Sequence, residues 1–60
     1  MEFLSPGGYV RLEGRPDWGL GQIQSVVGPR VTVNFEHAGK QLINTDRAIL
    51  LSVEDLRTAV

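Results

Sequence analysis

The 60-residue sequence contains no cysteine, so no disulfide and no thiolate metal site can stabilise the fold. It contains one histidine, His37, in a segment that predicts a turn, and its acidic residues are scattered through predicted loops and the C-terminal segment. A lone histidine without a cysteine or a carboxylate cluster predicts neither a metal site nor a nucleophile paired with a base. We therefore expect no catalytic residue, no metal, no cofactor and no enzymatic activity.

Long apolar runs are also missing. The longest, such as residues 48–51, fall far below the roughly 20 residues that a membrane-spanning helix needs. The N-terminus carries Glu2 where a signal peptide has basic residues. The sequence therefore predicts a cytoplasmic protein that does not enter a membrane.

Neither sign of charge dominates, because six lysines and arginines face seven aspartates and glutamates and the net charge is -1. This balance removes the general electrostatic attraction on which non-specific nucleic-acid binding depends. Weak binding to nucleic acid would need a local basic patch beside an aromatic residue, Trp18 or Tyr9, that stacks on a base. The candidates for that patch are Arg11, Arg15, Arg30 and Lys40.

What is present is the composition of a small globular domain: 42% of the residues are hydrophobic and 22% are charged. A chain of this length buries only about 60% of the surface of its unfolded state, so its core is small and leaves no room for a deep active site. We expect one domain over residues 6–53, between an N-terminal tail of residues 1–5 and a C-terminal segment of residues 54–60. That segment is either a tail or a short helix, since Ser52 and Asp55 have the spacing of a capping box.

The clearest strand is predicted over residues 30–36, where Val31, Val33 and Phe35 alternate with polar residues. Immediately before it, Gly28-Pro29 separates two strand-like runs. Glycine at the first central position and proline at the second suit a type II′ turn. Residues 20–27 and 30–36 are therefore predicted to form a hairpin.

Three further strands are predicted over residues 8–12, 40–44 and 49–52. In the first, Val10 points inward and Tyr9 and Arg11 point outward; in the second, Ile43 points inward and Lys40 and Leu42 point outward. Residues 13–19 form a long irregular loop, Gly39 takes a positive φ in a short turn, and residues 44–47 form one capped helical turn before the last strand.

Five short strands with these connections predict an all-β fold, a small five-stranded SH3-like barrel. Closing the sheet suits a short chain because closure leaves fewer unpaired strand edges. In such a barrel the second strand bends sharply, and Gly19 and Gly21 allow both the bend and the close approach of a neighbouring backbone. A phosphate-binding loop is less favoured, because the third glycine and the following helix of that motif are missing.

The stretch PGGYVRLEGRPDWGLGQIQSVVGPRVTVNFEHAGKQLI resembles a known pattern: a Gly-x-x-Val strand, an aromatic-Gly-x-Gly step into a strand, a turn, and a Val-x-Phe strand followed by Ala-Gly. The matching positions are Gly7, Val10, Trp18, Gly19, Leu20, Gly21, Gly28, residues 33–35, Ala38 and Gly39.

Over residues 6–51 the sequence is similar to the Tudor-like domain at the C-terminus of UvrD- and PcrA-type DNA-repair helicases. It looks closer still to a family of standalone small bacterial proteins known as a domain of unknown function. A looser likeness extends to the RNA-polymerase-interacting domains of the CarD type and of the transcription-repair coupling factor. The resemblance implies an adaptor in transcription or repair that docks on RNA polymerase, here without an attached helicase or DNA-binding domain.

We therefore predict a non-enzymatic, monomeric protein-binding module whose partner is RNA polymerase or a repair or transcription factor. Trp18 either closes one end of the barrel, which its motif favours, or presents an edge to the partner. A methyl-lysine cage is not expected, because it needs several aromatic residues that converge on one cation, and of the four present Phe35 is predicted to lie in the core. A second alternative to partner docking is self-pairing through an exposed strand edge. The predicted partner-binding residues are Tyr9, Arg11, Trp18, Lys40 and Leu42.

Overall fold

The computed structural model describes residues 4–53, and within them it contains five strands and one short 3-10 helix. The elements in chain order are β1 (Tyr9–Leu12), η1 (Pro16–Trp18), β2 (Gly21–Val27), β3 (Arg30–Phe35), β4 (Gly39–Asn44) and β5 (Leu50–Ser52). The predicted strands are confirmed to within one residue at their ends. The predicted C-terminal tail or helix lies outside the described residues. No helix in the described part of the chain is long and apolar enough to cross a membrane.

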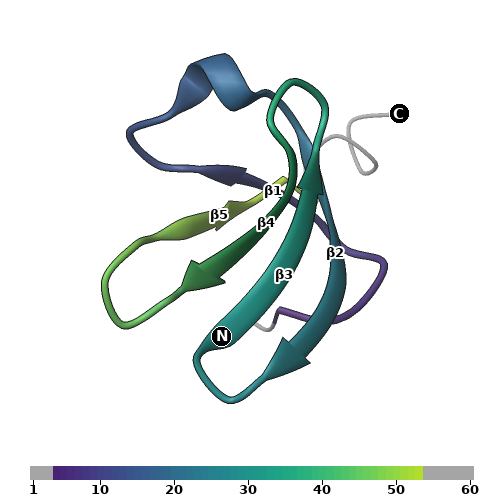
Figure 1. Ribbon diagram of the computed structural model, residues 1–60, viewed down its shortest axis with the longest axis vertical. Coiled ribbons are helices and arrows are strands. Elements are labelled where there is room, and N and C mark those ends of the chain that lie inside the picture. The colour runs from purple at the N-terminus through teal and green to yellow at the C-terminus, as the bar shows by residue number, and fades with distance from the viewer. Residues whose placement is uncertain (1–3, 54–60) are drawn as a thin grey trace.

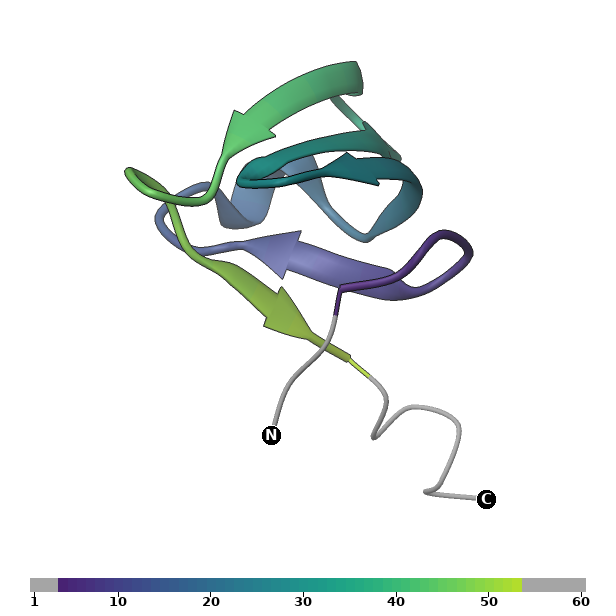
Figure 2. The same cartoon turned by 90° about the horizontal axis from the view of Figure 1, so that it is seen from below.

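The strands form one antiparallel sheet in the order β4-β3-β2-β1-β5. The sheet folds over on itself, so that β2, β3 and β4 lie in one layer and β1 and β5 lie in the other (Figures 1 and 2). The predicted all-β class with five strands is confirmed. The sheet is not closed into a barrel, because within residues 4–53 both β4 and β5 pair on one side only.

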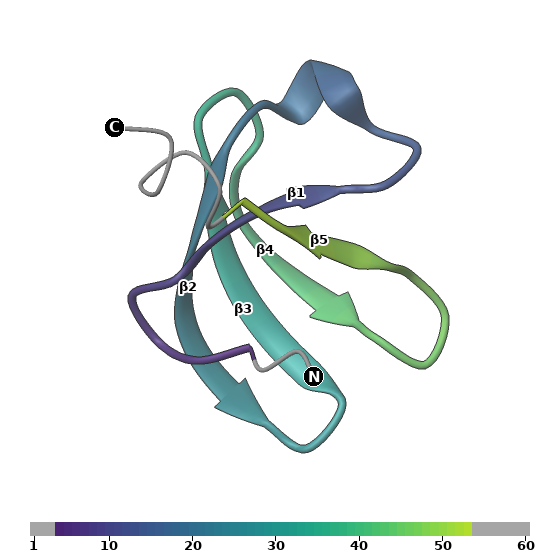
Figure 3. The ribbon, with the colours of Figure 1, turned by 180° about the vertical axis from the view of Figure 1, so that it is seen from behind.

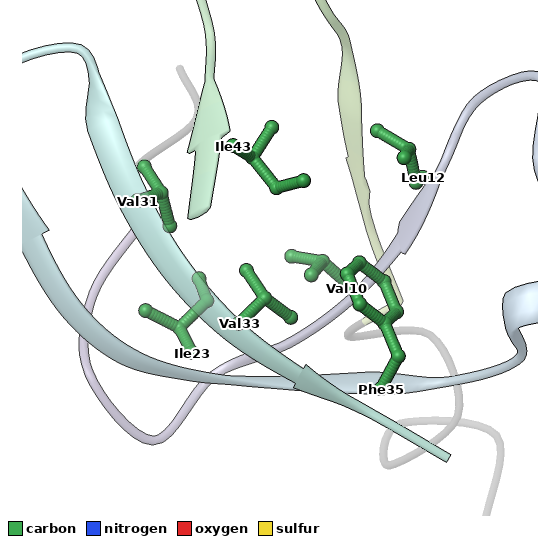
Figure 4. Close-up of a cluster of buried hydrophobic side chains, with 7 residues drawn as sticks. All are labelled: Val10, Leu12, Ile23, Val31, Val33, Phe35 and Ile43. Carbon is green, nitrogen blue, oxygen red and sulfur yellow. The ribbon is translucent and has the colours of Figure 1, made fainter. Parts of the chain in front are cut away.

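The core lies between these layers and consists entirely of aliphatic and aromatic side chains contributed by β1 to β4 (Figure 4). Each member comes from an inward position of the strand alternation, as the sequence pattern predicts. Partly buried apolar residues, among them Trp18 and Leu50, pack around it. The buried core residues among those described are Val10, Leu12, Ile23, Val31, Val33, Phe35 and Ile43.

The β2–β3 hairpin turns at Gly28-Pro29, as predicted. Val27 pairs with Arg30, so the loop has two residues, and Gly28 has a φ of 58°. No non-glycine residue in the described chain has a positive φ, so Pro29 does not. A positive φ at the first central residue only is the pattern of a type II′ turn.

One feature of β2 was not predicted: the pairing register shifts between Ile23 and Ser25, which indicates a β-bulge. An extra residue at a bulge reverses which side chains point inward beyond it. Val26, rather than Ser25, consequently packs against the core. The bulge also bends β2, and it is β2 that joins the two layers.

The two turn regions differ in how far they follow their predictions. At residues 44–47 the chain makes the predicted single capped turn, which does not continue into a helix: the Asn44 carbonyl accepts from the N–H of Arg47 and of Ala48, both at 3.0 Å, and the Asn44 Oδ1 atom accepts from the Asp46 N–H at 2.9 Å. The helix instead lies at Pro16–Trp18, inside the segment predicted to be irregular. Proline fixes the first helical φ, and Gly19, at φ 78°, ends the helix by donating to the Pro16 carbonyl at 3.1 Å.

Candidate binding face and groove

A row of exposed side chains crosses four strands on the outer face of the sheet. Tyr9 pairs with Gln22, Gln22 with Asn34, and Asn34 with Lys40, from β1 through β2 and β3 to β4. All of these residues are exposed, and side chains at paired positions project from the same face. The row therefore joins Tyr9 and Lys40, which the sequence placed on the binding surface separately, into one continuous surface.

A groove with a volume of about 550 Å³ opens over part of this row. Tyr9 lines it from β1, Leu20 and Gln22 line it from the β2 side, and Asn34 and Glu36 line it from the β3 side. His37 and Gly39 complete it toward β4. The lining offers a phenol, two carboxamides, a carboxylate and an imidazole, so the groove is suited to hydrogen bonding.

Hydrogen bonds join Glu36, on one side of the groove, to the segment that precedes β2. The Glu36 N–H donates to the Leu20 carbonyl at 2.9 Å, and the His37 N–H donates to the Trp18 carbonyl at 3.0 Å. In return the Leu20 N–H donates to the Glu36 carboxylate oxygen Oε1 at 3.1 Å. The antiparallel pairing of β3 thus continues past its end, and it holds the Glu36 side chain in place.

Glycine at position 19 favours this arrangement. A Cβ atom at this position would lie 2.8 Å from both the Glu36 Oε1 atom and the His37 Cδ2 atom, and the φ of 78° disfavours any other residue. The predicted corner of the fold is confirmed by the φ of Gly19, but the close neighbours of Gly19 and Gly21 are side chains and not the predicted backbone. That corner also shapes one side of the groove, which the sequence did not indicate.

Trp18 packs beside the core. Its ring meets Phe35 edge-on, with ring centroids 5.2 Å apart and an interplanar angle of 64°. The Arg15 guanidinium lies over the indole, 5.0 Å from the ring centroid, and its Nε is 3.9 Å from an Asp17 carboxylate oxygen. Phe35 therefore occupies one side of Trp18 and Arg15 covers a ring face, so binding a partner through that face would require Arg15 to move.

Two other predicted residues lie on different strands and point to solvent. Leu42 is 65% exposed on β4, where it pairs with Thr32. Arg11 lies on β1 and pairs with Leu51 of β5, so it belongs to the other layer of the sheet. The structure thus places Lys40 and Leu42 on the same strand and separates Arg11 from them.

The four basic residues proposed for a nucleic-acid patch, all within residues 4–53, do not gather at one place. Arg30 begins β3 at the β2–β3 hairpin, whereas Arg15 precedes η1, at the opposite end of the molecule (Figures 1 and 3). The strand partners of Arg11, Arg30 and Lys40 include no basic residue. The expected patch of Arg11, Arg15, Arg30 and Lys40 is therefore not formed as a whole, because the fold distributes these residues between its two layers and its two ends.

Most of the groove was missed by sequence analysis. Alternation identifies Gln22 and Asn34 as outward positions, but only the strand register places them side by side. Leu20 and Glu36 were assigned to strand ends and His37 to a turn. No short-range pattern predicts that these three residues line the same side of a groove. Within residues 4–53 there is no group of three or more His, Cys, Asp or Glu residues that could hold a metal ion.

These features define a small all-β domain with a groove on the outer face of its sheet. Residues 4–53 match the model of the family described as "Protein of unknown function (DUF3553)", and the chain belongs to this family. The predicted membership of a family of small domains of unknown function is confirmed. No curated protein and no solved structure matches the chain in the corresponding comparisons.

Proposed function

We propose that this domain is a non-enzymatic adaptor that docks on a larger protein through β4. The observation that carries the proposal is the position of Leu42, which is 65% exposed on a strand that has no neighbour on its outer side within residues 4–53. Such an edge has backbone N–H and C=O groups that a partner strand can pair with, while side chains like Leu42 provide selectivity. Lys40, on the same strand, favours an acidic or polar residue opposite it.

We further propose that the partner is RNA polymerase or a DNA-repair or transcription factor, and that the fold is an SH3-like, Tudor-like barrel left open between β4 and β5. The sequence resemblance to UvrD- and PcrA-type C-terminal domains and to CarD-type domains supports both statements. The folded-over sheet of five antiparallel strands agrees with the second.

The first test is a binding assay with purified RNA polymerase from the organism that encodes the chain. We expect Leu42→Asp to weaken binding by about tenfold or more, because a charge replaces an apolar contact at the centre of the docked edge. The matched control is Val27→Asp, since Val27 is 71% exposed on β2 and lies away from the β4 edge. Both variants should keep their free energy of unfolding within about 1 kcal/mol of wild type.

Two outcomes of this assay would contradict parts of the proposal. Equal binding by wild type, Leu42→Asp and Val27→Asp would remove β4 as the docking edge. Absence of binding to RNA polymerase, and to repair or transcription factors tested in the same way, would remove the named partners. Slowed amide hydrogen exchange along β4 in the complex would support strand pairing directly.

The alternative function, weak nucleic-acid binding, has one favourable observation: Tyr9 and Lys40 lie at the two ends of the same exposed row. It predicts an affinity that falls steeply as salt is added. Titrations with single-stranded and duplex DNA at low salt decide between the two functions, and we expect no chemical-shift change. Sedimentation at high protein concentration tests the second alternative, self-pairing, and we expect a monomer.

A further inference from the structure

The groove has an acidic rather than a basic lining. Glu36 is the acid in its lining, and among the described residues no lysine or arginine lines it. Lys40 lies at the end of the row beyond Asn34, on β4. A phosphate group in the groove would meet the Glu36 carboxylate, whereas a cationic group would be attracted to it.

The Glu36 carboxylate is held in position before any ligand arrives. Its Oε1 atom accepts the Leu20 N–H at 3.1 Å and lies 4.0 Å from the His37 Nε2 atom. No donor in the described part of the chain bonds to its second oxygen, Oε2, and the side chain is 58% exposed. A carboxylate with one oxygen anchored and the other free can accept a charged donor at little ordering cost.

The other lining groups suit a planar cation. Tyr9 lines the groove beside Gln22 and is 42% exposed, so an aromatic ring is available for a guanidinium to stack on. Gln22 and Asn34 are neighbours across β2 and β3 and each offers a carboxamide oxygen. A guanidinium has five N–H donors in one plane and can use several of these acceptors at once, which an ammonium on a flexible stem cannot do as well.

We propose that the groove binds an arginine side chain of the partner protein, with the guanidinium between the Tyr9 ring and the Glu36 carboxylate. This deepens the proposed function, since it supplies a second contact with a protein partner. It does not depend on strand pairing at β4, because the groove reaches β4 only at Gly39 and its lining does not include Leu42. Binding of a partner arginine in the groove would make docking selective for charge. Strand pairing at the β4 edge would by itself recognise mainly the backbone of the partner.

The test is an NMR titration of the isotopically labelled chain with N-acetyl-arginine amide. Its control ligand is N-acetyl-citrulline amide, which has the same shape and no charge. We expect saturating shifts at the amides of Tyr9, Gln22, Asn34 and Glu36 with the arginine ligand, and binding weakened about fivefold or more with the citrulline ligand. Shifts that are equal for both ligands, or that occur away from the groove, would overturn the proposal.

The decisive variant is Glu36→Gln, because the glutamine carbonyl can still accept the Leu20 N–H while the charge is lost. We expect it to weaken arginine binding about fivefold with the spectrum otherwise preserved. The control is Glu13→Gln, which removes the same charge from an exposed position outside the groove and should bind like wild type. Wild-type affinity in Glu36→Gln, or groove shifts with oligothymidylate in place of the arginine ligand, would contradict an arginine site.

Failure here is distinguishable from failure of the adaptor proposal. If the arginine ligand does not bind but Leu42→Asp still abolishes capture of the partner, docking occurs through β4 and the groove does not take arginine. If the arginine ligand binds and Leu42→Asp has no effect, the groove is a contact site and β4 is not.

Discussion

Replacing Phe35 with alanine is expected to lower the free energy of unfolding by about 3–5 kcal/mol. Phe35 is 2% exposed, lies between the two layers of the sheet and packs edge-on against Trp18 at 5.2 Å. Removing the ring leaves a cavity that the surrounding core side chains cannot fill without moving. Since a domain of this size is stabilised by only about 3–9 kcal/mol, this loss removes at least about a third of its stability, and at the lower end of that range it unfolds the variant at 25 °C.

Urea denaturation followed by Trp18 fluorescence measures this loss, and the dispersion of the amide NMR spectrum shows whether the fold survives. Leu42→Ala is the matched control: it also shortens a large apolar side chain in a strand, but one that is 65% exposed, and should change stability by less than about 0.5 kcal/mol. A loss below about 1 kcal/mol for Phe35→Ala would mean that the core is not organised around this ring.

The second large loss of stability is expected from Gly21→Ala, which adds a single methyl group. A Cβ at Gly21 would lie 2.5 Å from the Val33 Cγ1 atom and 2.7 Å from the Phe35 Cδ1 atom, far inside contact distance. Gly21 pairs with Val10 on one side and Phe35 on the other, so its backbone cannot shift without disturbing both β1 and β3. We expect a loss of about 1–3 kcal/mol from overpacking alone, because the φ of Gly21 is not positive.

Two comparisons isolate this steric cause. Gly14→Ala introduces a methyl group into open space at a φ of 88°. It should lower the free energy of unfolding by only roughly 1 kcal/mol, because its sole cost is an unfavourable backbone conformation. Combining Gly21→Ala with Val33→Ala removes the nearest clashing atom, so the double variant should be less destabilised than the sum of the single variants. Strict additivity, or a Gly21→Ala variant as stable as wild type, would contradict the close approach of β2 to β3.

The candidate site was predictable only in pieces. Alternation correctly placed Tyr9, Lys40 and Leu42 at solvent, because in a strand the direction of a side chain follows from its neighbours in sequence. Which outward residues share a surface depends on register, and the register of β2 is altered by a bulge that no residue pattern announced. The sequence therefore could not predict that Tyr9, Gln22 and Asn34 lie in one row, or that Glu36 forms a side of the groove. Both depend on the tertiary structure.

By itself the sequence determined the strands, the Gly28-Pro29 turn, the glycine corner before β2 and the inward positions of the core, because each depends on residues close together in the chain. The tertiary structure alone decided that the sheet stays open at β4 and β5, that the basic residues are dispersed, and that a groove with a held carboxylate crosses its outer face. Those properties arise from pairing between segments that lie far apart in sequence. Which of these segments pair depends on packing and hydrogen bonding summed over the whole chain, and no short stretch of sequence contains that information.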